Sequence, residues 1–195
     1  MNISTSSLGN IYLDGRETPR SVFSERARRM ANVLAEVGVE ADQPVAILMR
    51  NDVAYLEVIE ACRYLGAPYV ALNWHASTPE LIHILEDSKA KALVGHASLT
   101  AQFDETSGLY AKIFAMADPI TIAGTDLLDN TDTGLHEDLN RAIDLAAPIA
   151  SEPQRFRGLF AYTSGSTNYE CIHMFLFYLF NMLYLDYFII YRFKT

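Results

Sequence analysis

The chain has 195 residues, of which half are apolar and a fifth are charged, and its formal net charge is -9. This length and composition suit a globular protein with a substantial hydrophobic core. Binding to nucleic-acid phosphates depends on clustered basic residues, and the acidic balance without a Lys/Arg block argues against that class of partner.

Cysteine usage and the amino terminus both indicate a reducing, cytoplasmic setting. The two cysteines, Cys62 and Cys171, are too few for a disulfide framework and lack the spacing of metal ligands. The opening residues MNISTSSLGNIYLDGRE contain no basic segment followed by an apolar one, so no secretory signal is predicted. We therefore expect a cytoplasmic protein and predict no metal-binding residues.

In chain order, the apolar pattern predicts helices that alternate with strands. Helical spacing covers 21–38, then 52–66, then 77–90, with Ser21 or Ser24, Asp52 and a Ser/Thr pair as caps at the starts. Gly38 and Gly66 suit the left-handed residue that ends a helix. Short continuous apolar runs predict strands covered on both faces, over 44–50, 67–72 and 91–95.

The later part of the body carries weaker patterns. Residues 139–145 have helical spacing, 118–124 resemble a further strand, and the apolar LFAYT follows a polar connection. The order of helices and strands fits parallel crossover units and predicts an α/β fold, with a parallel-rich doubly wound sheet and flanking helices. Residues 1–168 are predicted to form this domain.

Three histidines and the tryptophan are candidate site residues. Trp74 and His75 follow a predicted strand, where ligand sites of α/β proteins gather. A buried aromatic residue and a polar loop histidine explain them equally well. For His83 and His96 we expect a structural or surface role, because no Ser/His/Asp or Cys/His pairing is legible at any spacing.

Charged residues on the predicted helices are interpreted as solvent-facing. Glu57 and Glu60 are expected to face solvent, and Cys62, among apolar helix residues, is expected to be a small core residue. A solvated helix face is also expected for three basic residues, Arg26, Arg28 and Arg29.

The stretch YTSGSTN, residues 162–168, carries the clearest chemical signal. It follows an apolar strand, and Gly165 permits dihedral angles that are closed to other residues. Successive backbone N–H groups in such a loop can form an anion-binding nest. Hydroxyl groups are supplied by Thr163, Ser164, Ser166 and Thr167. A solvated turn rich in Ser, Thr and Gly is the alternative interpretation.

YTSGST resembles the start of the phosphate-binding signature of the AMP-forming adenylate ligases, which include acyl-CoA synthetases, peptide-synthetase adenylation domains and luciferases. The resemblance extends over roughly residues 10 to 167. Three segments occur in the family's order and near its spacing: VAILMRN, ACRYLGAPYVALN and TPELIHILEDSKAKALV. LNWHASTPEL is most similar to fatty-acid and related acyl-CoA ligases.

The resemblance implies a two-step reaction. A carboxylic acid, with a fatty acid as the expected substrate, attacks the α-phosphorus of ATP to give an acyl-adenylate, and coenzyme A then displaces AMP. Mg²⁺ would neutralise the phosphates. The resemblance assigns the β- and γ-phosphates to a cofactor-binding loop of Thr163, Ser164, Gly165, Ser166 and Thr167. It assigns no catalytic residue.

The sequence departs from the family pattern after Thr167. Asn168 replaces a glycine, and no Pro-Lys-Gly follows. The family's adenine and ribose motifs, its magnesium-associated carboxylate and its mobile domain with a catalytic lysine are also not found. We therefore expect a truncated amino-terminal AMP-binding domain that is inactive in isolation. The alternative is a non-enzymatic remnant, associated with membranes through its apolar tail.

Residues 169–195 differ from the body in composition. They contain no Ala, Gly, Val or Pro, and ten of them are Tyr or Phe, so we interpret them as a frameshift or junction product. The run 171–191 approaches the roughly 20 apolar residues that span a bilayer. His173, Asn181 and Asp186 interrupt it. We expect aggregation rather than membrane contact, because a charge within a span is costly.

Overall fold

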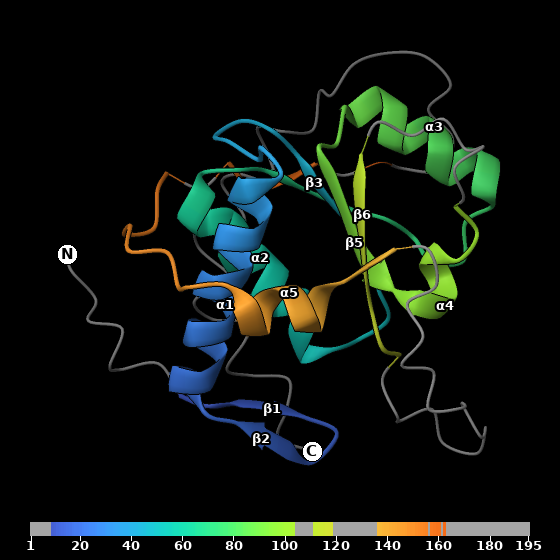
Figure 1. The fold of residues 1–195 in the computed structure, drawn as a ribbon. Helices are drawn as coiled ribbons and strands as arrows, with labels where there is room; N and C mark the ends of the chain where they lie inside the picture. Colours follow the sequence, from blue (N-terminus) through green and yellow to red (C-terminus); the bar gives the residue numbers. More distant parts are fainter. Residues whose placement is uncertain (1–8, 104–110, 119–135, 156, 161, 163–195) are drawn as a thin grey trace.

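The computed structural model describes residues 9–103, 111–118, 136–155, 157–160 and 162. Within these ranges a parallel sheet lies between two layers of helices (Figure 1). The predicted α/β fold with a parallel-rich sheet is thereby confirmed. The segment 169–195 lies outside the described residues.

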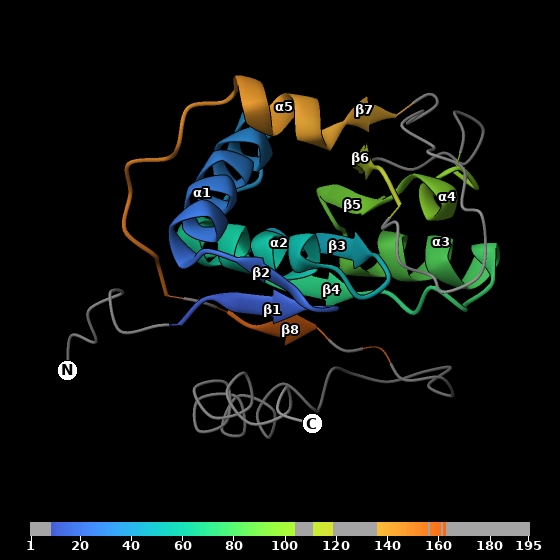
Figure 2. The ribbon, with the colours of Figure 1, turned by 90° about the horizontal axis from the view of Figure 1, so that it is seen from below.

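The sheet has six strands in the order β7-β6-β5-β3-β4-β8, and each neighbouring pair is parallel. In Figure 2 the strands succeed one another from β7 at the top to β8 at the bottom. The central strand β3 pairs Val45 with Tyr69 on one side and with Ala92 on the other. The strands are β3 (Val45–Leu48), β4 (Tyr69–Ala71), β5 (Ala92–His96), β6 (Lys112–Met116), β7 (Glu137–Asp138) and β8 (Leu159–Phe160).

The helices cover both faces of the sheet. In Figure 1, α1 (Arg20–Glu36), α2 (Val53–Leu65) and α5 (Leu139–Leu145) lie on one side, and α3 (Thr78–Ser88) and α4 (Ala97–Thr100) lie on the other. Val45 and Ile47 pack in the core under α1 and α2, whereas Ala46 and Leu48 pack under α3. Because both faces of β3 are buried, the strand has the continuous apolar sequence from which it was predicted.

Of the predicted side-chain caps, that of α2 is confirmed, whereas Ser77 stands at the N-cap position of α3 without a side-chain hydrogen bond. Asp52 caps α2 by accepting a hydrogen bond from the Ala54 N–H at 3.1 Å, and Gly66 ends this helix with φ +69°. Gly38 has φ +84° after α1. The predicted cap of α1 at Ser21 or Ser24 was wrong, because the helix begins at Arg20, directly after Pro19, and has no side-chain cap.

Four strands of this fold were not predicted. A hairpin joins β1 (Ile11–Leu13) to β2 (Arg16–Thr18) through Asp14 and Gly15, both with positive φ. An Asp-Gly pair is a recognised signal for such a turn. The strands β6 and β7 were also missed. Of the predicted strand 118–124, Asp118 lies beyond the end of β6, and 119–124 lie outside the described residues.

None of the helices in the described ranges combines the length and apolar character needed to cross a membrane. The run 171–191 lies outside these ranges, so its contact with a membrane stays a prediction.

Candidate functional site at the carboxyl edge of the sheet

Polar side chains gather at the edge where the parallel strands end. The helix that follows β3 covers one face of the sheet, and the helix that follows β5 packs on the other. The connections from these two adjacent strands therefore diverge, which defines the topological switch point of the sheet. Ligands of open α/β sheets bind in the crevice at this point, outside the carboxyl ends of the strands.

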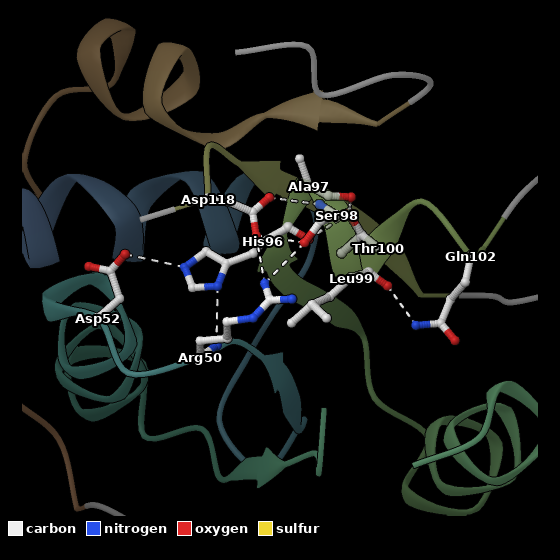
Figure 3. Close-up of polar contacts among 9 residues, drawn as sticks. All are labelled: Arg50, Asp52, His96, Ala97, Ser98, Leu99, Thr100, Gln102 and Asp118. Carbon is white, nitrogen blue, oxygen red and sulfur yellow. Dashed lines mark hydrogen bonds and ion pairs between the residues drawn. The ribbon is translucent and has the colours of Figure 1, made fainter. Parts of the chain in front are cut away.

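Residues at the ends of three strands, or just beyond those ends, form a polar group that we call the edge cluster (Figure 3). Its members are Arg50, Asp52, His96, Ser98 and Asp118. They come from the ends of β3, β5 and β6 and from the first turns of α2 and α4. The edge cluster thus connects, through side-chain contacts, elements that are far apart in the sequence.

The Arg50 side chain is held by residues that follow β5 and β6. Its Nη1 atom donates to Asp118 Oδ1 at 2.6 Å and to Ser98 Oγ at 3.0 Å. Ser98 in turn donates to Asp118 through its hydroxyl at 2.6 Å and its backbone N–H at 2.9 Å. The Asp118 side chain is 7% exposed, so this charge-assisted pair is shielded from water on most sides.

His96 forms the second half of the edge cluster. Its ring is fully buried, its Nδ1 accepts a hydrogen bond from the Arg50 backbone N–H at 3.1 Å, and its Nε2 lies 3.2 Å from Asp52 Oδ2. Because Nδ1 is an acceptor, the neutral ring carries its hydrogen on Nε2, and this N–H donates a hydrogen bond to Asp52. The expected structural role of His96 is in accord with these contacts.

The pKa of Asp52 is lowered. Burial raises it, but hydrogen bonds from His96 and from the Ala54 and Val53 N–H groups favour the carboxylate and outweigh burial. Asp52 is therefore an ionised acceptor shared between the cap of α2 and the edge cluster.

Trp74 and His75 lie at the same edge, in the turn after β4. Their ring centroids are 3.4 Å apart, and the guanidinium carbon of Arg50 lies 5.2 Å from the centroid of the Trp74 ring. Trp74 is 40% exposed, so the interpretation of a buried aromatic residue was wrong. The alternative, a residue near a ligand site, stays a prediction.

The predicted phosphate loop begins where the description of the chain ends. Thr163, Ser164, Gly165, Ser166 and Thr167 lie outside the described residues, so their role stays a prediction.

The strand before the loop is described. The strand β8 runs parallel to β4, with Val70 opposite Phe160, and the chain therefore reaches residue 162 at the carboxyl edge. Tyr162 donates its hydroxyl to Asp87 Oδ2 at 2.6 Å.

A second polar group lies among the helices, away from this edge. We call it the helix-layer cluster: Arg26, Glu57 and Asn140. The Glu57 side chain is 4% exposed and accepts from Arg26 Nε at 3.1 and 3.2 Å, and Arg26 Nη2 donates to Asn140 Oδ1 at 3.0 Å. Burial raises the pKa of Glu57; the Arg26 charge opposes this shift, and the charge of Asp52 adds to it.

These contacts correct the prediction of solvated faces on α1 and α2. Glu57 is buried, and Glu60 pairs with Arg63 at 3.0 Å, with 14% of its side chain exposed. Arg28 and Arg29 donate to the backbone carbonyls of Ile149 and Ala146. The apolar spacing of α1 does not reveal this burial, because the arginines are covered by α5 and by the segment that follows it, which lie more than 100 residues further along the chain.

Two other expectations can be assessed. Cys62 is fully buried in the core, as predicted, and burial raises the pKa of its thiol to about 12. His83 is exposed, in accord with a surface role. Among the described residues, no three His, Cys, Asp or Glu side chains come together as a group that could hold a metal ion.

Sequence reasoning missed the edge cluster, apart from the capping role of Asp52. The available signal was position, since each member lies within a few residues of the end of a strand or the start of a helix. The sequence pattern puts Arg50 at the end of one predicted strand, 44–50, and Asp118 at the start of another, 118–124, so it gives no indication that the two side chains meet.

The chain matches the family model described as AMP-binding enzyme over residues 15–168. A feruloyl-CoA synthase from Amycolatopsis is 45% identical over 72 residues, which are 37% of this chain and 15% of that protein.

Two solved structures share the fold. An anthranilate CoA ligase in complex with anthranoyl-AMP matches with a TM-score of 0.65 at 20% identity, over 83% of this chain and 30% of that one. An O-succinylbenzoate coenzyme A synthetase from Bacillus subtilis in complex with AMP matches with a TM-score of 0.55 at 25% identity, over 81% and 35%. The chain therefore spans about a third or less of the length of the proteins it matches.

Proposed function

Because the chain belongs to the AMP-binding enzyme family, we propose that it forms the amino-terminal, phosphate-binding part of an ATP-dependent acid–CoA ligase. In the proposed reaction a carboxylate attacks the α-phosphorus of ATP, and pyrophosphate leaves. The thiol of coenzyme A then attacks the acyl carbon, and AMP leaves with the bonding electron pair of the acyl–oxygen bond. The cytoplasm is the proposed location.

One observation carries this proposal: the hydroxyl-rich sequence YTSGST continues directly from β8, at the carboxyl edge of a parallel sheet. Ligands of such sheets bind at this edge. The hydroxyl and backbone N–H groups of residues 163–167 would hold the β- and γ-phosphates, and Mg²⁺ would neutralise their charge. Gly165 would let the backbone approach the phosphates closely.

The same sequence supports binding without turnover. Asn168 and the apolar residues after it provide no lysine next to the loop. Stabilisation of a transferring phosphoryl group depends on several positioned charges at once. We propose that a polypeptide of this sequence binds Mg-ATP but does not form an adenylate.

The division of the chain is a further part of the proposal, with 1–168 as the AMP-binding domain and 169–195 as a frameshift or junction product. Reading the DNA after codon 168 in all three frames tests this division. A Gly-x-Pro-Lys-Gly equivalent in another frame supports a frameshift, and its absence from every frame favours a junction formed by rearrangement or insertion.

The acyl group is proposed to be that of a fatty acid, on the likeness of LNWHASTPEL to fatty-acid–CoA ligases. Feruloyl-CoA synthase and O-succinylbenzoate coenzyme A synthetase are named for aromatic acids, which makes an aromatic acid the competing substrate class. Saturation-transfer NMR of the Mg-ATP-loaded chain with octanoate and with ferulate separates them, and transfer to ferulate alone contradicts the fatty acid.

Nucleotide binding and turnover are measured separately to test the function. Equilibrium dialysis against labelled Mg-ATP should show saturable binding, and ATP–pyrophosphate exchange should stay at background. The double variant Ser166→Ala/Thr167→Ala should weaken binding at least about tenfold, the loss of roughly one to two charge-assisted hydrogen bonds. The control Ser21→Ala/Ser24→Ala removes the same number of hydroxyls from α1 and should bind like the unmodified chain.

Two results contradict the proposal. Exchange above the level of the loop variant would show turnover and overturn the inactive state. A chain that binds no Mg-ATP and co-floats with liposomes would favour the alternative, a membrane-associated remnant without nucleotide function.

A further inference from the structure

Trp74 is the only tryptophan of the chain, and it lies at the carboxyl edge in the turn after β4. This turn is closed by local hydrogen bonds: Asn73 Oδ1 accepts from the His75 N–H at 3.0 Å, and Asn73 O accepts from the Ala76 N–H at 2.9 Å. These bonds fix the backbone of the turn. They do not involve the indole, and Trp74 is 40% exposed as a residue.

The indole lies against the ring of the adjacent His75, with 3.4 Å between the centroids, and it also contacts a side chain that follows another strand. The Arg50 guanidinium lies over the Trp74 ring, with 5.2 Å between its central carbon and the ring centroid. A cation over an indole face is a favourable contact, and it is stronger where water is partly excluded. The Arg50 side chain is 23% exposed, so it is partly shielded at this position.

Arg50 itself has little freedom to move. Its Nη1 is shared between Asp118 and Ser98, and Ser98 holds Asp118 through two further hydrogen bonds. The backbone N–H of Arg50 is bound to the buried ring of His96. Both ends of the residue are therefore anchored, the backbone on β5 and the guanidinium on the residues after β5 and β6 (Figure 3).

We infer that Arg50 is a positioning residue that fixes the orientation of Trp74 at the carboxyl edge, and that Asp118 acts through Arg50. Asp118, after β6, holds Arg50, after β3, and Arg50 in turn contacts Trp74 in the turn after β4. The strand β4 is the direct neighbour of β8, which leads into the loop at 163–167. Arg50 thus determines how a large aromatic side chain is presented to a ligand at this edge, a consequence that rests on the proposed function.

The fluorescence of Trp74 reports its local environment in the native state, and a change in overall stability alone does not alter this signal. Acrylamide quenching and fluorescence anisotropy report the exposure and mobility of Trp74 in the native state, without denaturant and at about pH 8, above the usual range of histidine titration. Arg50→Met keeps an unbranched side chain and removes the cation. Loss of the contact should lower the ratio of stacked to unstacked orientations of the indole about two- to fivefold. Quenching by acrylamide should rise and the anisotropy should fall.

Three further variants make the test specific. Asp118→Asn leaves Arg50 in place but weakens its anchor, and it should change the Trp74 signals in the same direction by a smaller amount. Arg50→Lys keeps the charge without the planar fork, and it should restore part of the signal. Arg26→Met breaks the ion pair of the helix-layer cluster, and it should lower stability while the Trp74 signals stay unchanged.

The outcomes divide clearly. Equal Trp74 signals in the unmodified chain and Arg50→Met overturn the inference, and so does an equal change in Arg26→Met, which would indicate a loosened fold. A signal that moves in Arg50→Met but not in Asp118→Asn removes Asp118 from the proposal. If the unmodified chain binds no Mg-ATP in dialysis, the proposed function fails, while the quenching data still decide the role of Arg50.

Discussion

The edge cluster and the helix-layer cluster each place a carboxylate near the start of α2 against a nitrogen-containing side chain, and the pKa values of the two carboxyl groups shift in opposite directions. Asp52 in the edge cluster has a lowered pKa, whereas Glu57 in the helix-layer cluster has a raised one. The two residues lie on one helix, and the charge of Asp52 contributes to the raised pKa of Glu57. Position within one small region thus decides in which direction the pKa of each carboxyl group shifts.

The difference lies in the number of donors that each carboxylate receives. Asp52 accepts from His96 and from the first backbone N–H groups of α2, whose dipole also favours an anion at this end. Glu57 lies within the helix, where the backbone N–H groups are already used, and its contacts in the described chain come from Arg26. One ion pair does not offset burial, which accords with the general balance for buried pairs.

The largest loss of stability should come from adding a side-chain atom at Gly95, directly before His96 of the edge cluster. A Cβ added at Gly95 would lie 2.8 Å from the Leu48 carbonyl oxygen and 2.6 Å from Thr100 Cγ2. Gly95→Ala should therefore lower the free energy of unfolding by about 2–3 kcal/mol, as overpacking does. Urea denaturation measures this loss. Gly9→Ala, where no atom lies within 4 Å, is the matched control and should have almost no effect.

Removal of the cation from the helix-layer cluster should have the next largest effect. Arg26→Met leaves the Glu57 carboxylate buried without its partner and should cost about 2 kcal/mol, less than for a fully buried pair because Arg26 is 30% exposed. Arg63→Met breaks the Arg63–Glu60 pair, whose arginine is 42% exposed, and should cost at most about 0.5 kcal/mol. Equal losses in the two variants would contradict the burial argument.

Asp52 and Glu57 should contribute to the pH dependence of stability with opposite signs. A lowered folded-state pKa gives Asp52 a stabilising contribution that is present above its ordinary value near 3.8 and is lost as the pH falls through the folded-state pKa. For Glu57, whose pKa is raised, the contribution is present below its ordinary value near 4.5 and is lost as the pH rises through the folded-state pKa.

Two variants test these signs in denaturation series over the acidic range. Asp52→Asn should retain more of its neutral-pH stability on acidification than the unmodified chain does. Glu57→Gln should retain less, because it lacks the gain that protonation of Glu57 provides. Series that shift in the same direction for both variants would show that the two carboxylates do not differ.

The smallest effect is expected at the exposed edge of the sheet. Lys112 and Glu137 form an ion pair at 3.0 Å between β6 and β7, with about half of each side chain exposed. Lys112→Ala should change the free energy of unfolding by no more than about 0.5 kcal/mol. A loss as large as that of Arg26→Met would mean that exposure does not control the strength of these pairs.

The sequence allowed much of the fold to be predicted and little of the site. Buried strands such as Val45–Leu48 and capped helices such as Val53–Leu65 carry local signals, and both were found near their observed bounds. The edge cluster depends on contacts such as Arg50 to Asp118, which are 68 residues apart. Only the strand order brings them together, and no local pattern contains that order.

Hydrogen–deuterium exchange of the full chain with and without Mg-ATP is the most direct test of the carboxyl edge as the ligand site. We predict that added Mg-ATP slows exchange in the loop at 163–167, in the turn after β4 and at the Arg50 and Ser98 amides, while α1 and α5 around the helix-layer cluster exchange as before. Protection confined to the helix layer, or saturable Mg-ATP binding without protection at this edge, would contradict the assignment.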